Sequence, residues 1–93
     1  MTSILIIGAG IGGVASAARL ARNGYDVTVV EKNSVPGGRC NQILRDGHRF
    51  DVGPSLLLMP KVFDETYAAL GEKMEDHLDL RRVDPTYRVR FDD

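Results

Sequence analysis

The chain has 93 residues, of which 43% are hydrophobic and 27% charged, as in an ordinary soluble globular protein. This length allows one small core, with about two-thirds of the unfolded surface buried, and excludes a large two-domain enzyme within the chain. Twelve Lys and Arg against thirteen Asp and Glu give a net charge of −1, so nothing in the charge favours nucleic-acid binding.

The first eighteen residues carry no charge, which raises the question of a signal peptide or a membrane span. No Lys or Arg precedes Arg19, whereas a signal peptide begins with positive charge. Four glycines within residues 8–13 would weaken an isolated apolar helix, and a span needs about 20 apolar residues. We therefore expect the start of a folded domain in a protein that is not secreted, without a transmembrane helix, and either cytoplasmic or peripheral on a membrane.

A strand, a tight turn and a helix are predicted at the start of the chain. Residues 4–7 are a short apolar run, typical of a strand buried on both faces. The spacing GxGxxG follows at Gly8, Gly10 and Gly13. A helical face is predicted from the recurrence of Ile11, Val14, Ala18 and Ala21.

The helix is predicted to end at Asn23-Gly24, where glycine can adopt the left-handed conformation. Residues 25–31 then indicate a second strand, which completes a βαβ unit. Strand, glycine turn and helix in this order are typical of a dinucleotide site, and the alternative is a glycine-rich turn that binds nothing.

Each glycine of the motif has a physical role at a dinucleotide. Gly8 permits a sharp turn, Gly10 lets the backbone approach a pyrophosphate, and Gly13 lets the helix pack closely on the sheet. The phosphates would face N–H groups at the positive end of the helix. Glu31 could accept hydrogen bonds from both hydroxyls of an adenosine ribose and would repel a 2′-phosphate, which disfavours NADP.

A second glycine pair follows Glu31. Gly37 and Gly38 allow another close backbone approach, and Arg39 offers a planar fork of donors for phosphate. A nicotinamide dehydrogenase has no general need of a second anion site at this place, which makes NAD less favoured. The alternative is a plain turn after Pro36, with Arg39 as a solvated surface charge.

The middle of the chain predicts a hairpin. Residues 41–45 and 48–52 are short strand candidates on either side of Asp46-Gly47, a strong hairpin signal. Residues 56–59 are apolar, and we expect them to form an exposed patch.

A second helix is predicted from Pro60, which suits a first helical turn. Its core-facing stripe is predicted to contain Phe63, Thr66, Tyr67, Leu70 and Met74. A membrane-surface or substrate-channel helix is the alternative, although its mixed charges argue against simple docking on anionic lipid. Residues 77–83 and 86–91 then indicate two further strands.

The remaining candidates carry little chemistry. His48 and His77 lack the carboxylate or cysteine neighbours of a metal site and are interpreted as surface histidines, so no metal is expected. The single cysteine, Cys40, excludes an internal disulfide framework and is interpreted as a small packing residue rather than a nucleophile.

Four segments together resemble the N-terminal region of FAD-dependent amine oxidases and carotenoid desaturases: GAGIGG, VVEKN, PGGRC and RFDVGPS. The chain resembles most closely the phytoene desaturase family in its fungal-type and bacterial branch, because of residues 47–55 and the apolar run behind them. The resemblance extends over residues 4–93. It implies an α/β fold: a Rossmann-like FAD/NAD(P)-binding βαβ unit with a following β-hairpin and helix, truncated.

Residues 1–93 would accordingly be an incomplete FAD-binding region, with the substrate domain and a second, C-terminal flavin motif absent. The resemblance implies that residues 8–13 hold the FAD pyrophosphate and that the ribose is bound by Glu31, with Lys32 beside it. Gly38 and Arg39 would lie along the pyrophosphate and ribityl chain. The flavin end would be approached by Gly53, Pro54 and Ser55. The cofactor-binding residues are therefore expected to be Gly8, Ala9, Gly10, Ile11, Gly12, Gly13, Glu31, Lys32, Gly38, Arg39, Gly53, Pro54 and Ser55.

The activity implied by the resemblance is desaturation of an apolar polyene such as phytoene, with hydride transfer to FAD and formation of a C=C bond. No residue of this chain can be named as catalytic, and the chain alone is expected to be inactive. The complete enzyme could associate peripherally with a membrane. The alternatives are a non-catalytic dinucleotide-binding remnant and the front end of another amine-oxidase-like flavoprotein, such as a carotene isomerase, an oxygenase or an amine oxidase.

Overall fold

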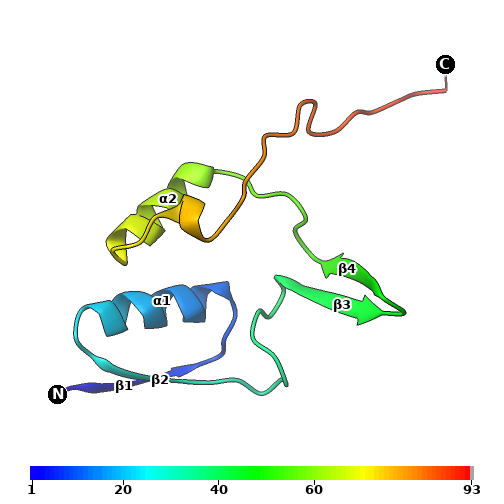
Figure 1. Ribbon diagram of the computed structural model, residues 1–93. Helices are drawn as coiled ribbons and strands as arrows, with labels where there is room; N and C mark the ends of the chain where they lie inside the picture. Colours follow the sequence, from blue (N-terminus) through cyan, green and yellow to red (C-terminus); the bar gives the residue numbers. More distant parts are fainter. Residues whose placement is uncertain (93) are drawn as a thin grey trace.

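The structure is a computed structural model that describes residues 1–92; Asp93 lies outside the described residues. Two helices and four strands follow one another along an extended molecule (Figure 1). In chain order the elements are β1 (Ser3–Ile7), α1 (Ile11–Arg22), β2 (Asp26–Val30), β3 (Asn41–Arg45), β4 (His48–Val52), α2 (Pro60–Ala69) and the 3₁₀ turn η1 (Met74–Asp76).

The predicted βαβ unit is confirmed. β1 and β2 pair in parallel from Ser3 opposite Asp26 to Ile7 opposite Val30, and α1 crosses between them. Past the end of β1, the Gly8 N–H donates to the Val30 carbonyl at 2.7 Å. The helix ends at Arg22 as predicted, and Gly24 has a φ of +92°, which its lack of a Cβ permits.

Two details of this unit differ from the prediction. In α1 the partly buried residues are Gly13, Ala15, Ala17, Ala18 and Leu20, and Gly13 lies against β1. Of the predicted face, Ala18 is partly buried, whereas Ile11, Val14 and Ala21 are exposed. β1 is covered on one side by α1, and its other face leaves Leu5 and Ile7 exposed. The prediction of a strand buried on both faces is therefore wrong for the described residues, because α1 is the only layer packed against β1 and β2.

The predicted hairpin is confirmed as well. β3 and β4 pair antiparallel, from Asn41 opposite Val52 to Arg45 opposite His48. Asp46 and Gly47 have φ angles of +52° and +77°, the two successive positive values that a type I′ turn requires. The two-residue loop thus sets the register that the sequence predicted.

α2 begins at Pro60 as predicted and lies on the side of α1 that faces away from the sheet (Figure 1). The predicted stripe is confirmed, because all of its members are partly buried: Phe63, Thr66, Tyr67, Leu70 and Met74. The helix itself ends at Ala69, so that Met74 belongs to η1. One side-chain bond links the helices, from the Arg19 guanidinium to Thr66 Oγ1 at 3.1 Å.

The two strands predicted at 77–83 and 86–91 do not form. Residues 78–92 carry no strand. Residues 79–84 pass beside residues 55–60, and the end of the segment extends away from the rest of the molecule (Figure 1). A strand needs a neighbour that accepts and donates its backbone hydrogen bonds, and none lies beside this segment within residues 1–92. The alternation of Arg88, Val89 and Arg90 was therefore insufficient to produce a strand.

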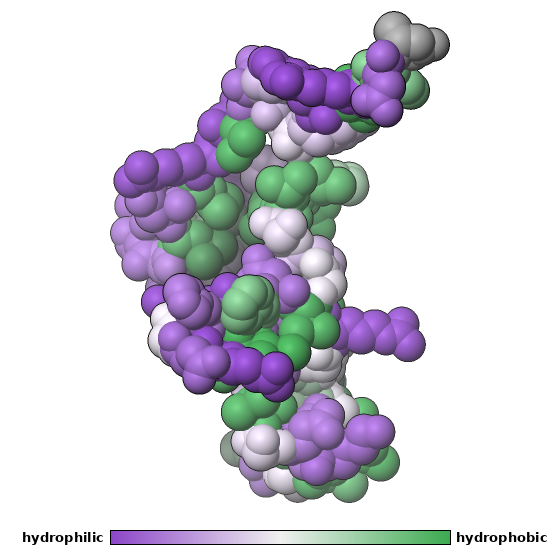
Figure 2. All heavy atoms as spheres, turned by 90° about the vertical axis from the view of Figure 1, so that its right-hand side faces the viewer, coloured by the Kyte–Doolittle hydropathy of each residue, from purple (hydrophilic) through white to green (hydrophobic). Residues whose placement is uncertain are grey.

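The molecule has almost no enclosed core. Ala9, with 6% of its surface exposed, is the one buried hydrophobic residue among residues 1–92. The accessible area is 8334 Å², whereas a compact chain of this size exposes roughly 5,300 Å². The prediction that two-thirds of the surface is buried is therefore wrong, and apolar side chains are open to solvent at several places in Figure 2.

The shape agrees with this open packing. The radius of gyration is 17.0 Å, against roughly 12 Å for a compact domain of this length. Among the helices that the structure describes, neither is long and apolar enough to cross a membrane.

Candidate functional site

The turn between β1 and α1 is built from glycines. Gly8 has a φ of +102°, which turns the chain sharply off the strand. Gly10 is the extended N-cap of α1, and no side chain caps this helix end. The N–H groups of the first helical turn therefore remain available for an anion, at the positive end of the helix dipole.

Gly13 shows why the third glycine of the motif is needed. A Cβ at this position would overlap the Gly8 carbonyl oxygen and lie 3.5 Å from Ile6 Cγ2. α1 can therefore approach β1 this closely only without a side chain at Gly13. At Gly10 and Gly12, by contrast, a Cβ would meet nothing within 4 Å. This open cradle in front of the helix N-terminus fits a dinucleotide pyrophosphate.

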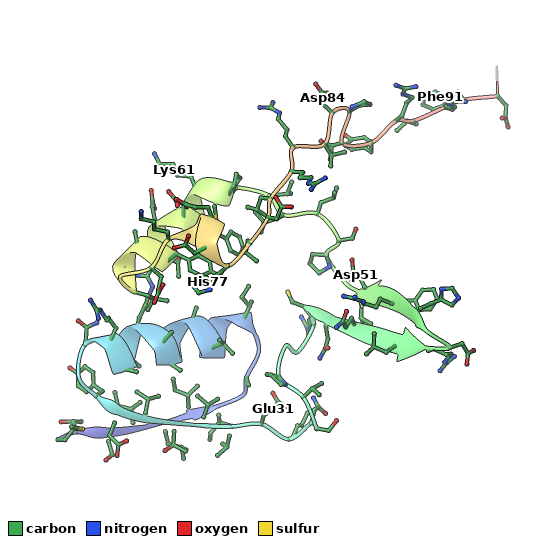
Figure 3. All side chains as sticks on the ribbon, viewed as in Figure 1. Glu31, Asp51, Lys61, His77, Asp84 and Phe91 are labelled. Carbon is green, nitrogen blue, oxygen red and sulfur yellow. The ribbon has the colours of Figure 1, made fainter. Side chains whose placement is uncertain are left out.

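Glu31 follows β2 and connects it with the glycine loop (Figure 3). One carboxylate oxygen, Oε1, accepts the Ala9 N–H at 2.9 Å, and the other, Oε2, accepts the Asn33 N–H at 2.8 Å. The carboxylate thus lies beside the N-terminus of α1, where an adenosine ribose would have to lie if the phosphates occupied the cradle.

We expect the contact of Glu31 with the loop to survive mild acid. The hydrogen bonds from the Asn33 and Ala9 amides hold the pKa of Glu31 below its ordinary value of 4.5. A depressed pKa stabilises the fold above the unfolded-state pKa, and this stabilisation is lost as the pH falls through the folded-state value. In an NMR titration the midpoint of the change in the Ala9 amide shift should lie below pH 4.5. A midpoint above 4.5 would contradict this expectation.

The second glycine pair packs against the first glycine loop. The Gly37 N–H donates to the Ala9 carbonyl at 2.8 Å, and Gly37 forms a parallel bridge with Gly10. A Cβ on Gly38 would lie 3.3 Å from the Gly10 Cα. The two loops therefore form one surface, and the close approach of the glycine pair is to the Gly10 backbone. Its approach to a cofactor phosphate stays a prediction. Arg39 follows directly and is exposed beside them.

Gly53 brings the end of the hairpin to the same place. Its φ is +108°, and a Cβ there would overlap the Arg39 carbonyl oxygen. The following Pro54 and Ser55 are exposed, and Ser55 already lines a different, apolar groove. Lys32 is exposed next to Glu31. The structure thus unites residues 8–13, Glu31, Gly37 to Arg39 and Gly53, while Pro54 and Ser55 lead away from them.

Two residues near this site were not singled out from the sequence. Asn33 supplies one of the two amides that bind Glu31. Asn41 donates from Nδ2 to the Pro36 carbonyl at 3.2 Å and accepts the Gln42 N–H on Oδ1 at 2.8 Å, which closes the second glycine turn. The signal for Asn41 was its position directly after that turn, where Asn side chains bind nearby backbone.

The apolar patch predicted at residues 56–59 is confirmed as exposed, with Leu58 70% and Met59 71% accessible. This patch and residues 79–84 line an open groove of about 700 Å³. The interpretation of Cys40 as a packing residue is wrong, because Cys40 is exposed in the turn between Gly37 and β3.

The two histidines lie at the surface as predicted. His48 is exposed, and His77 stacks on Tyr67 with ring centroids 5.3 Å apart and contacts Glu72 Oε2 at 3.3 Å. Within residues 1–92 no group of three His, Cys, Asp or Glu side chains is placed to hold a metal ion.

Comparison with known proteins agrees with this geometry. Residues 6–72 match the family model described as an NAD(P)-binding Rossmann-like domain. The chain is 62% identical over 90 residues to a phytoene desaturase of Phycomyces blakesleeanus, covering 97% of this chain and 15% of that protein. It is 56% identical over 90 residues to a zeta-carotene-forming phytoene desaturase of Myxococcus xanthus, covering 97% of this chain and 17% of that protein.

A bacterial 4,4′-diapophytoene desaturase from Staphylococcus aureus is 46% identical over 89 residues, covering 96% of this chain and 18% of that protein. The chain therefore spans less than one-fifth of the length of the curated relatives it matches. Among solved structures, an oxidoreductase from Methanosarcina mazei is similar, with a TM-score of 0.54 and 38% sequence identity. The match covers 59% of this chain and 13% of that one.

Proposed function

Because this chain belongs to the NAD(P)-binding Rossmann-like domain family and is similar along its length to phytoene desaturases, we propose that it binds the adenosine half of FAD within a carotenoid desaturase-like oxidoreductase. The observation that carries the proposal is the contact of three glycine segments: Gly37 and Gly38 pack on the glycine loop before α1, and Gly53 packs on Arg39. Gly10, Gly38 and Gly53 come from separate parts of the chain. A Cβ on Gly38 would lie 3.3 Å from the Gly10 Cα, and a Cβ on Gly53 would overlap the Arg39 carbonyl oxygen. A Cβ on Gly10 would meet no protein atom and would occupy the space in front of the helix.

Each segment has a task in this proposal. Residues 8–13, including Ala9, Ile11 and Gly12, hold the pyrophosphate against the first turn of α1. Glu31 binds the adenosine ribose, with Lys32 beside it. Gly38 and Arg39 follow the pyrophosphate and ribityl chain, and the exposed Arg39 guanidinium can bond phosphate oxygens in pairs. The flavin end of FAD is approached by Gly53, Pro54 and Ser55.

When bound, FAD would supply the electron chemistry of the complete enzyme, as the acceptor of a hydride from a substrate carbon in the formation of a C=C bond. The residues of this chain bind and orient the cofactor. We propose residues 1–93 as an incomplete FAD-binding region, with an apolar polyene as the substrate of the complete enzyme and a membrane surface as its peripheral partner.

A ligand titration of the purified chain tests the cofactor. We expect weak FAD binding, weaker NAD binding, and the weakest binding for NADP, because the Glu31 carboxylate would repel a 2′-phosphate. Flavin fluorescence and calorimetry measure the three affinities, and far-UV circular dichroism checks that the helices are formed. NADP binding as tight as FAD binding would contradict the assignment.

A chimaera tests the activity. This chain would replace the matching 90 residues of the Myxococcus xanthus desaturase, to which it is 56% identical. We expect the chimaera to retain flavin and to convert phytoene in lipid vesicles, and the chain alone to give no product. A folded chimaera that lacks flavin would favour a non-catalytic module, and turnover by the chain alone would contradict its incompleteness.

A further inference from the structure

Glu31 makes contacts that binding a ribose does not require. Both of its oxygens accept backbone N–H groups, from Ala9 at 2.9 Å and from Asn33 at 2.8 Å. These two amides lie on opposite sides of Glu31 in the sequence, one in the glycine loop and one in the turn after β2. Neither bond involves a ligand, so both exist in the protein by itself.

Ala9 is the residue through which these contacts reach the phosphate cradle. It is the most buried hydrophobic residue of the described chain, 6% exposed, and its peptide groups are held on both sides. Its N–H donates to Glu31, while its carbonyl accepts the Gly37 N–H at 2.8 Å. Glu31 and Gly37 therefore fix the orientation of the loop between Gly8 and Gly10.

The carboxylate can hold the loop and bind a ribose at the same time. Two carboxylate oxygens offer about four acceptor sites, of which the Ala9 and Asn33 amides use two. The remaining sites are sufficient for the two ribose hydroxyls. A loop that is already ordered spares the nucleotide the cost of ordering it.

We propose that Glu31 is a positioning residue for the phosphate site as well as a ribose ligand: it holds the glycine loop in its phosphate-accepting shape before any nucleotide binds. The inference rests on the proposed function, since it concerns the same site. It makes a distinct statement, namely that removal of Glu31 weakens binding even of a nucleotide that has no ribose hydroxyls.

The test compares the 93-residue chain with its Glu31→Ala variant, using ADP and 2′,3′-dideoxy-ADP as probes. If Glu31 served the ribose alone, its loss would leave the dideoxy probe unaffected. We expect instead that calorimetry shows about fivefold weaker dideoxy-ADP binding by Glu31→Ala. Equal affinity of both proteins for the dideoxy probe would overturn the proposal.

Asp26→Asn is the matched control. Asp26 is a carboxylate at the other end of β2 and also contacts β1 residue Ser3, at 3.4 Å from Oγ to Oδ2. Its replacement should leave the affinities for both probes unchanged. If it weakened dideoxy-ADP binding as much as Glu31→Ala does, the loss of any carboxylate near β2 would explain the weaker binding, and the proposal would fail.

Amide hydrogen exchange in the absence of nucleotide tests independently whether Glu31 binds the Ala9 and Asn33 amides. In the wild-type chain the Ala9 and Asn33 amides should be protected, and in Glu31→Ala both should exchange about tenfold faster while the β1–β2 ladder stays protected. Should Glu31→Ala fail to fold, Glu31→Gln replaces it, because one amide oxygen can retain only one of the two bonds. Unprotected Ala9 in the wild type would overturn the proposal, whereas a wild type that binds no ADP would overturn the proposed function.

Discussion

Replacing Gly13 with alanine is expected to abolish measurable FAD binding and to loosen α1 from the sheet. The new Cβ would overlap the Gly8 carbonyl oxygen, which is backbone and cannot rotate away as a side chain would. Overpacking of this kind costs about 1–3 kcal/mol. The displaced Gly8 carbonyl belongs to the glycine loop, so the strain acts on the proposed phosphate site. FAD fluorescence titration and urea unfolding followed by circular dichroism measure the two effects.

Gly12→Ala is the control for stability. It adds the same methyl group one residue earlier in the same helix, where a Cβ meets nothing within 4 Å. Alanine favours helix over glycine, so this variant should unfold at a higher urea concentration, with a gain of about 0.5 kcal/mol. Equal loss of stability in both variants would mean that the clash with Gly8 is not the cause.

The sequence predicted the elements that are specified locally. Backbone conformations at Gly8, Gly24 and Gly47 follow from the single property that glycine has no Cβ, so turns and helix ends could be located from residue types. The hairpin register followed from a two-residue loop, and the α2 stripe from helical spacing. The predicted approach at Gly37 and Gly38 was to a ligand phosphate, whereas the partner in the structure is the Gly10 backbone.

The predictions that were wrong concern features that depend on neighbouring segments of the folded chain. Ile11 and Val14 are apolar but exposed, whereas Gly13 lies against β1, where a Cβ would overlap the Gly8 carbonyl oxygen. Alternation at Val89 and Phe91 indicates a strand only if another strand lies beside it, and the described residues provide none. Cys40 was judged from its size, yet its exposure depends on how the turn before β3 bends.

Of the candidate site, the sequence predicted the members but not their contacts. Residues 8–13, Glu31, Gly38 and Gly53 could be named from their motif, whereas the bonds of Glu31 to two backbone amides could not. Glu31 lies at neither a helix N-cap nor an Asx turn, where a contact with backbone could be recognised from the sequence. The position of Asn33 two residues after the acid was therefore recognisable only from the structure.

Replacing Gly53 with alanine is expected to separate the end of the hairpin from Arg39, which follows the second glycine pair. The substitution carries two costs: roughly 1–2 kcal/mol for an alanine at positive φ, and about 1–3 kcal/mol for overlap with the Arg39 carbonyl oxygen. Relief of the overlap would move Arg39, which we propose lies along the pyrophosphate. We therefore expect about tenfold weaker FAD binding in addition to the loss of stability.

Gly24→Ala separates these two costs, because Gly24 has a similar φ of +92° and a Cβ there meets nothing within 4 Å. It should show the conformational cost alone and bind FAD as the wild type does. The difference between the two variants in urea midpoint then measures the contact between Gly53 and Arg39, and their difference in FAD affinity measures how far the hairpin supports the site. If Gly24→Ala and Gly53→Ala behaved alike, the end of β4 would play no part in binding, and the site would consist of the two glycine loops and Glu31 alone.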